Sequence, residues 1–248
     1  KNSIEGYVTY LHNEETMELP DSVKWAEAYP TKFNIIKENL QGVDRDIALV
    51  MLSKEFWMYV QNDDFYKQSA IIDDYFKTNK TRESFYDLFS KNYKGFLAIA
   101  PGEPAPDFTL LDQNDNEVSL SQFEDKIVYI DFWGTWCGPC IDAIPDHLKL
   151  QEKLKDKNDV VFLNVALEYG EKDIKRWKNF LAEKNWPGVH VVAEKQFNNE
   201  ELSPYKLTAA PSYVLVNKGG KLVGPRADGP YNILETIQPL LDKPIKSE

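Results

Sequence analysis

The chain has 248 residues, a formal net charge of −11, and 42% hydrophobic and 28% charged residues. These values are typical of a globular protein with one large domain or two ordinary ones. No run of about 18 apolar residues occurs, so the sequence predicts no transmembrane segment. The acidity is spread along the chain without a basic stripe, which argues against nucleic acid and anionic membranes as partners.

Residues 1–100 are predicted to form a mainly helical domain. Residue 1 is Lys rather than Met, which is compatible with removal of a leader or tag. A short strand is possible at 7–11, and apolar spacing predicts helices over 22–39, 44–60, 63–77 and 81–98. Their apolar positions are unusually aromatic, which favours a bundle core, with a groove for a partner or peptide as the alternative. These aromatic residues are Trp25, Phe33, Phe56, Trp57, Phe65, Tyr66, Phe76, Phe85, Phe89 and Phe96.

Three prolines between Ala100 and Pro106 interrupt any helix and indicate an extended linker, so a second domain is predicted over residues 101–248. Strands that alternate with helices predict an α/β fold, with a mostly parallel sheet covered on both faces. The expected strands are 108–111 and 117–120 as a hairpin, 126–132, 160–167, 189–193, and 213–216 and 221–223 as a second hairpin. The expected helices are 137–155, 171–184, a short one around 198–206, and 231–242.

Only two cysteines occur, Cys137 and Cys140, at the point where the strand 126–132 gives way to a helix. A structural disulfide framework would use more cysteines at wider spacing. A structural zinc site requires a second pair of ligands beside the two cysteines. The three histidines are scattered along the sequence, so no metal site is predicted. A dithiol at the carboxyl end of a central strand lies where open α/β sheets place their chemistry.

The two cysteines are expected to differ in role. Cys137 should lie at the N-terminus of its helix, where free backbone N–H groups favour a thiolate, so it is the expected nucleophile. Cys140 lies one turn further along and is expected to be shielded, and to resolve the mixed disulfide by attacking Cys137. The alternative is a pair of inert buried thiols.

Asp131 is a carboxylate inside an apolar run, where burial is unfavourable without a purpose. Its pKa should rise, which would let it take the proton of Cys140 if it points under the helix. The alternative is an outward-facing residue at the end of a strand. Pro145 lacks the N–H that would bond back one turn and is expected to kink the helix.

Pro211 precedes a strand. If its bond to Ala210 is cis, the backbone of Ala210 can pair with an extended substrate beside the dithiol. Trp136 is expected to belong to the apolar contact surface around Cys137, whereas Trp133 is expected to pack beneath the loop. The predicted substrate surface consists of Trp136, Gly138, Pro139, Ala210 and Pro211.

The run from Asp131 to Cys140, D-F-W-G-T-W-C-G-P-C, with Pro145 five residues on, resembles the active site of the thioredoxin superfamily. Pro211, followed by Ser212 and an apolar strand, matches the cis-proline of that family. The opening from Pro104 to Leu110, the hairpin and the extra segment at 171–193 are similar to the TlpA-like branch and to the AhpC/TSA group. The resemblance covers residues 101–243. It implies a thioredoxin-like fold with a central mixed sheet, flanking helices and an N-terminal β-hairpin. The all-α domain that precedes this fold is predicted from apolar spacing and is not covered by the resemblance.

The resemblance implies a thiol-disulfide oxidoreductase that reduces protein disulfides, with no cofactor beyond the Cys137–Cys140 disulfide. It implies a disulfide-containing client, an upstream dithiol electron donor, and an extracytoplasmic place in the bacterial periplasm or anchored by lipid at the envelope. The Gly-Pro spacer differs from the Glu-Pro of several TlpA-like proteins and is typical of general reductants. A thiol peroxidase is one alternative, although Phe132 replaces the proline of the peroxiredoxin motif. The other is a binding module whose helices recruit clients.

Overall fold

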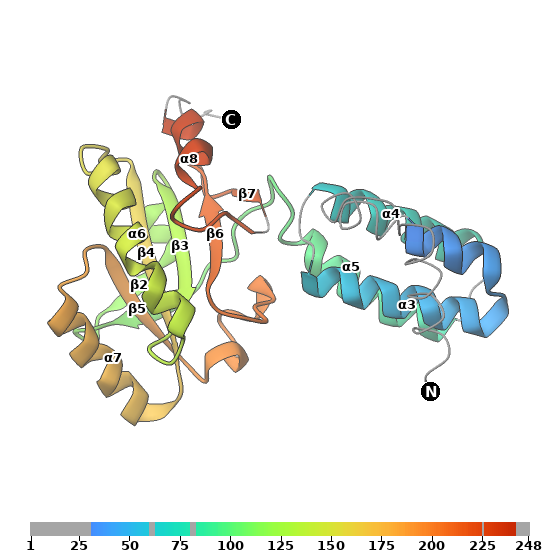
Figure 1. The fold of residues 1–248 in the computed structure, drawn as a ribbon, viewed down its shortest axis with the longest axis horizontal. Coiled ribbons are helices and arrows are strands. Elements are labelled where there is room, and N and C mark those ends of the chain that lie inside the picture. Colours follow the sequence, from blue (N-terminus) through green and yellow to red (C-terminus); the bar gives the residue numbers. More distant parts are fainter. Residues whose placement is uncertain (1–30, 60–62, 80–82, 225, 242–248) are drawn as a thin grey trace. The chain divides into compact units, whose positions relative to one another are not determined.

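The computed structural model describes residues 31–59, 63–79, 83–224 and 226–241. The chain divides into two compact units, Lys1–Leu97 and Ala98–Glu248, which are described separately. Figure 1 shows helices alone in the described part of the first unit and a sheet with helices in the second. Within the described residues, every helix is too short or too polar to cross a lipid bilayer.

The first unit contains a helix over residues 31–39, followed by α3 (Gly42–Tyr59), α4 (Asp63–Thr78) and α5 (Glu83–Leu97). The predicted helices 44–60, 63–77 and 81–98 are confirmed to within a few residues. The predicted strand at 7–11 and the start of the helix 22–39 lie outside the described residues. Gly42 adopts a φ of 55°, a left-handed conformation that suits glycine and separates the first helix from α3.

Aromatic side chains share the core of this unit with aliphatic ones such as Leu49 and Ile72. Phe33 meets Tyr75 edge-on at 6.3 Å, and Phe76 packs against Phe89 at 5.3 Å between ring centroids. Of the ten aromatic residues predicted as core, Phe33, Phe76, Phe89 and Phe96 are buried, and Tyr66 and Phe85 are partly buried. Trp25 and the side chains of Phe56, Trp57 and Phe65 lie outside the described part of the chain.

The second unit is built on a seven-stranded mixed sheet with the order β2-β1-β5-β4-β3-β6-β7. Only β3–β4 and β4–β5 pair in parallel, and the other four pairings are antiparallel. The mixed sheet is therefore confirmed, and the expectation of a mostly parallel sheet is wrong. The reason is that two hairpins, β1–β2 and β6–β7, extend the parallel centre at its two edges. The strands are β1 (Thr109–Asp112), β2 (Glu117–Ser119), β3 (Ile127–Trp133), β4 (Val160–Glu168), β5 (Val189–Glu194), β6 (Ser212–Val216) and β7 (Leu222–Gly224).

Alternate residues of β3 face opposite sides of the sheet. Tyr129 and Trp133 pack with residues of α6 (Gly138–Leu154), α7 (Gly170–Lys184) and α8 (Leu234–Leu241), so the helices cover this face. Phe132 points the other way and meets Tyr205 at 5.4 Å. Tyr205 belongs to a short 3₁₀ turn, so at this point irregular chain, and not a helix, covers the second face.

One predicted helix is wrong. The segment 198–206 forms no α-helix but contributes to two 3₁₀ turns, η2 (Gln196–Asn198) and η3 (Ser203–Tyr205). Pro204 lacks the N–H needed to continue an α-helix, and Lys206 leaves the turn with a φ of 52°. The last helix, expected from residue 231, begins at Leu234, and its predicted end at 242 lies outside the described residues.

Candidate active site

The dithiol sits at the junction of β3 and α6. Gly134 follows the strand directly, at a point where an added Cβ would collide with the indole of Trp136, so a larger residue would require the indole to move. Cys137 caps the N-terminus of α6 with extended backbone angles. Pro139 lies in the first turn of the helix, where its missing N–H leaves no hydrogen bond unmade.

Cys137 and Cys140 are joined by a disulfide, with their Cα atoms 5.3 Å apart. The backbone N–H of Cys140 donates a hydrogen bond to Sγ of Cys137, at 3.2 Å. Cys137 is 3% exposed and Cys140 2% exposed, so burial alone does not distinguish them. Their positions do, because only Cys137 faces the unpaired N–H groups at the head of the helix.

Asp131 is buried and lies under α6. This is the first of its two predicted orientations, and the outward-facing alternative is wrong. Its Oδ2 lies 3.0 Å from Nε2 of His147, and both side chains are at most 3% exposed. Burial raises the pKa of the Asp131 carboxyl, and the neighbouring His147 opposes part of that rise. His147 follows Cys140 by seven residues, or two helical turns, so both residues face the sheet.

Aromatic rings enclose the Asp131–His147 pair. The ring of His147 lies 6.0 Å from Tyr129, 5.9 Å from Tyr213 and 5.5 Å from Trp186. Oδ1 of Asp131 and both ring nitrogens of His147 lack a hydrogen-bond partner among the described residues, so the 3.0 Å approach of Nε2 to Oδ2 is a charge contact. Buried polar atoms without partners often mark internal water or a site of proton transfer.

The loop before Cys137 is anchored to the end of β4. Oε1 of Glu168 accepts the backbone N–H of Thr135 at 2.7 Å, and the indole N–H of Trp136 donates to the carbonyl of Leu167 at 2.6 Å. The guanidinium of Arg176 donates from Nε to the Thr135 hydroxyl at 2.7 Å and lies 3.3 Å from Oε2 of Glu168. Burial raises the pKa of the Glu168 carboxyl.

The bond between Ala210 and Pro211 is cis, as expected. Ala210 packs against the apolar cluster that contains both cysteines, which brings the predicted backbone-pairing site close to the dithiol. Gly138 and Pro139 are exposed. Trp136 is 42% exposed and meets Phe197 edge-on at 6.0 Å. The residues of the predicted substrate surface thus come from two separate segments, 136–139 and 210–211.

The other two residues with predictions near the dithiol are Trp133 and Pro145, and the structure tests only the first. Trp133 is fully buried against Trp186, at 5.1 Å between ring centroids, so it packs beneath the loop as expected. Pro145 lies inside α6, and the kink assigned to it stays a prediction. No cluster of three or more His, Cys, Asp or Glu suited to a metal ion is present among the described residues.

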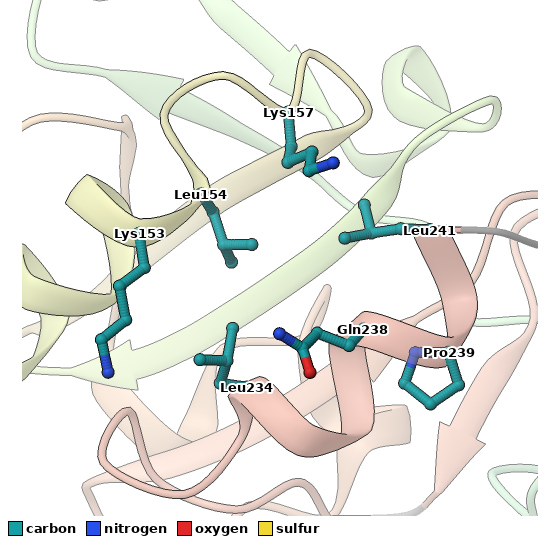
Figure 2. A pocket seen from close by; sticks show the side chains of 7 residues that line it. All are labelled: Lys153, Leu154, Lys157, Leu234, Gln238, Pro239 and Leu241. Atoms are coloured by element: carbon teal, nitrogen blue, oxygen red, sulfur yellow. The ribbon is translucent and has the colours of Figure 1, made fainter.

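A pocket of about 690 Å³ lies at the other end of α6. Figure 2 shows Leu154, Leu234 and Leu241 around it, with Gln238 between them. The N-terminus of α6 carries the dithiol, and a helix of 17 residues spans about 25 Å. The pocket is therefore remote from the candidate active site.

Sequence reasoning missed His147 and Glu168. His147 was counted only as a scattered histidine, although its seven-residue spacing from Cys140 places both on one helical face. Glu168 is the last residue of the apolar strand β4. It lies at the carboxyl end of the parallel strands, where the dithiol follows β3. An acid at that position in a parallel neighbour of β3 was a usable signal.

Comparison with known proteins places this site in a wider group. The Redoxin family model matches residues 100–227. The thiol-disulfide oxidoreductase ResA of Bacillus subtilis is 30% identical over 138 residues, which cover 56% of this chain and 73% of the relative. ResA of Geobacillus kaustophilus is 31% identical over 137 residues, covering 55% and 75% respectively.

Solved structures resemble the same part of the chain. A thiol:disulfide interchange protein from a Bacteroides species is 28% identical, covers 60% of this chain and 95% of its own, and gives a TM-score of 0.51. A crystal structure from Bacteroides vulgatus is 30% identical, covers 56% of this chain and 95% of its own, and gives a TM-score of 0.50. About two fifths of the chain lies outside either match.

Proposed function

The chain belongs to the Redoxin family and is a thiol-disulfide oxidoreductase, and from this premise we propose that it reduces disulfide bonds in other proteins. Cys137 is the nucleophile and Cys140 the resolving thiol. The observation that carries the proposal is the position of Cys137 at the head of α6, with the N–H of Cys140 donating to its sulfur. That hydrogen bond and the helix dipole stabilise a thiolate at Cys137.

The reaction proceeds by two exchanges. The Cys137 thiolate attacks one sulfur of the client disulfide, which forms a mixed disulfide and releases the first client thiolate. Cys140 then attacks Sγ of Cys137, which releases the second client thiolate and closes the Cys137–Cys140 disulfide. The client gains two electrons and the protein loses two. An upstream dithiol donor returns the protein to its reduced form.

The second exchange requires that Cys140 lose its proton. We assign the proton to Asp131, whose Oδ1 has no hydrogen-bond partner among the described residues. His147 contacts the other oxygen, Oδ2, and so leaves Oδ1 available. His147 therefore acts as a positioning residue, and the Asp131 carboxyl, with its raised pKa, acts as the base.

Substrate contact is proposed for the surface formed by Trp136, Gly138, Pro139, Ala210 and Pro211. An extended client segment would pair with the backbone of Ala210 and lie across the dithiol. No further cofactor is required by these exchanges, because electrons and protons pass between thiols and the carboxyl. An extracytoplasmic location at the bacterial envelope is proposed from the family resemblance.

The proposal is tested with insulin as a disulfide substrate. Cys137→Ser should abolish reduction, because no other described residue supplies a thiolate at the helix N-terminus. Cys140→Ser should still attack but accumulate a mixed disulfide, detectable by mass spectrometry. Retention of turnover in the Cys137→Ser protein would contradict the assignment of the nucleophile.

A further inference from the structure

Arg226 lies against the loop that carries the cis-proline. We call residues 208–212 the cis-proline loop. The guanidinium of Arg226 donates from Nη1 to the Ser212 hydroxyl and from Nη2 to the Thr208 hydroxyl, each at 3.5 Å. The backbone behind it is fixed, because the N–H of Ala227 donates to the carbonyl of Tyr213 at 2.8 Å.

The charge of Arg226 has no counter-charge in the described part of the chain. Its two partners are neutral hydroxyls at the limit of hydrogen-bonding distance, and no described carboxylate lies within ion-pairing distance. Arg176, by contrast, pairs with both Glu168 and Asp173. Arg226 is also partly buried, and this burial lowers the pKa of its guanidinium. A partly desolvated cation without a partner is unfavourable on its own.

The chemistry of this group suits a carboxylate. A guanidinium presents a planar fork of N–H donors that matches both oxygens of a carboxylate, and such charge-assisted pairs are among the stronger hydrogen bonds. The Ser212 hydroxyl already donates to the carbonyl of Ala209 at 2.7 Å, so toward Arg226 it acts as an acceptor. The Thr208 hydroxyl beside the guanidinium can donate to the same carboxylate.

The position of Arg226 connects this chemistry to the dithiol. Thr208 and Ser212 bracket Ala210 and Pro211, and Ala210 packs against the cluster that holds both cysteines. A client segment paired with the backbone of Ala210 would therefore lie two residues from Thr208, whose hydroxyl contacts the guanidinium. We propose that Arg226, with Thr208, is a carboxylate-binding subsite that favours clients with an Asp or Glu side chain next to the reacting cysteine.

This inference rests on the proposed function, and its test separates the two. The probes are pairs of peptides with one internal disulfide, in which one peptide carries Glu and the other carries Gln at the same position. This position is, in turn, the residue directly before and the residue directly after one of the cysteines. The reduced full-length protein is assayed for kcat/KM with each peptide. The formal net charge of −11 repels acidic peptides in general, so a preference for Glu requires a local cation.

For at least one position the Glu peptide should react about tenfold faster than its Gln partner. Arg226→Gln should remove the preference and leave the Gln peptide unaffected, and Arg226→Lys should retain part of it. Lys206→Gln, which removes an exposed charge from the neighbouring turn, should keep the preference. Equal rates for Glu and Gln at all positions would overturn the subsite, as would an equal loss for both peptides in Arg226→Gln. Failure to reduce either peptide would overturn the proposed function as well.

Discussion

A buried carboxyl makes the stability of this protein depend on pH in a direction set by its surroundings. The pKa of Asp131 is raised in the folded state, so the folded protein holds this proton more tightly than the unfolded chain does. Its contribution to stability is therefore complete below the ordinary carboxyl pKa and is lost as pH rises through the folded pKa.

Asp131→Asn should therefore be more stable than the parent at pH 8, and the difference should vanish toward pH 3. Urea denaturation of the oxidised proteins at a series of pH values measures this. A difference that does not change with pH would show that Asp131 is not buried as the protonated group. In the reduced protein the same variant should slow the Cys140 step by about 100-fold, the usual scale of general base catalysis.

His147 should affect the same step through Asp131. His147→Leu removes the neighbour that opposes the rise in the pKa of Asp131, so the pKa should rise further. The pH profile of mixed-disulfide resolution should then shift to higher pH, measured by stopped-flow release of the client thiol. His147→Gln, which keeps a hydrogen-bond donor, should shift it less. A lower melting temperature without any shift in the pH profile of mixed-disulfide resolution would show that His147 has a packing role only.

The residue scale also shows where sequence reasoning reached its limit. The type and spacing of Asp131, Cys137 and Cys140 predicted either a buried acid beneath the dithiol or an outward-facing one, and the structure buries it. The contact between Asp131 and His147 depends on how α6 packs against β3. The spacing of residues within either element does not determine that packing. The same applies to Arg226. It follows β7, whereas its partners Thr208 and Ser212 lie before β6 and at its first residue, so the contact depends on how the β6–β7 hairpin folds back.

At the scale of elements, the end of β4 holds the loop that precedes the nucleophile. Glu168 accepts the N–H of Thr135 and faces Arg176 of α7, so one carboxylate joins β4, α7 and the loop. Both the loop and the strand were predicted, but their connection was not. It arises from the parallel register that aligns Trp133 with Ala166 and so brings the two strand ends together.

Glu168→Ala should lower the free energy of unfolding by about 1–3 kcal/mol, because it leaves the Thr135 N–H and the guanidinium without this partner. Chemical denaturation measures the change. Glu168→Gln, which keeps an acceptor, should recover most of it, and Glu171→Ala provides a control with the same loss of charge at an exposed site of α7. An equal effect of Glu168→Ala and Glu171→Ala would refute the anchoring role.

At the scale of the whole molecule, the dithiol and every residue proposed to act with it belong to the second unit. The helical unit contributes an aromatic core together with exposed apolar side chains, among them Ile71 and Leu88. Composition and periodicity were enough to predict a helical region followed by an α/β unit, and the mixed sheet was implied by the family resemblance. The partly antiparallel sheet could not be read from alternation alone, because hairpin strands join its edges without a helix.

Residues 98–248 alone should reduce a peptide disulfide at the rate of the full chain. If the helical unit recruits clients, the Cys140→Ser form of the shortened protein should trap fewer native clients than the Cys140→Ser form of the full chain. Activity assays and mass spectrometry of trapped mixed disulfides measure the two effects. A loss of peptide reduction in a folded 98–248 fragment would show that the helical unit takes part in the chemistry.

The reduction potential of this dithiol decides whether it donates electrons to client disulfides. Equilibration of the Cys137–Cys140 pair with glutathione buffers of defined ratio, followed by alkylation of free thiols, gives its reduction potential. The Gly-Pro spacer shared with thioredoxin predicts a low value, about −270 mV. A value near −120 mV, that of a strong oxidant, would contradict the account.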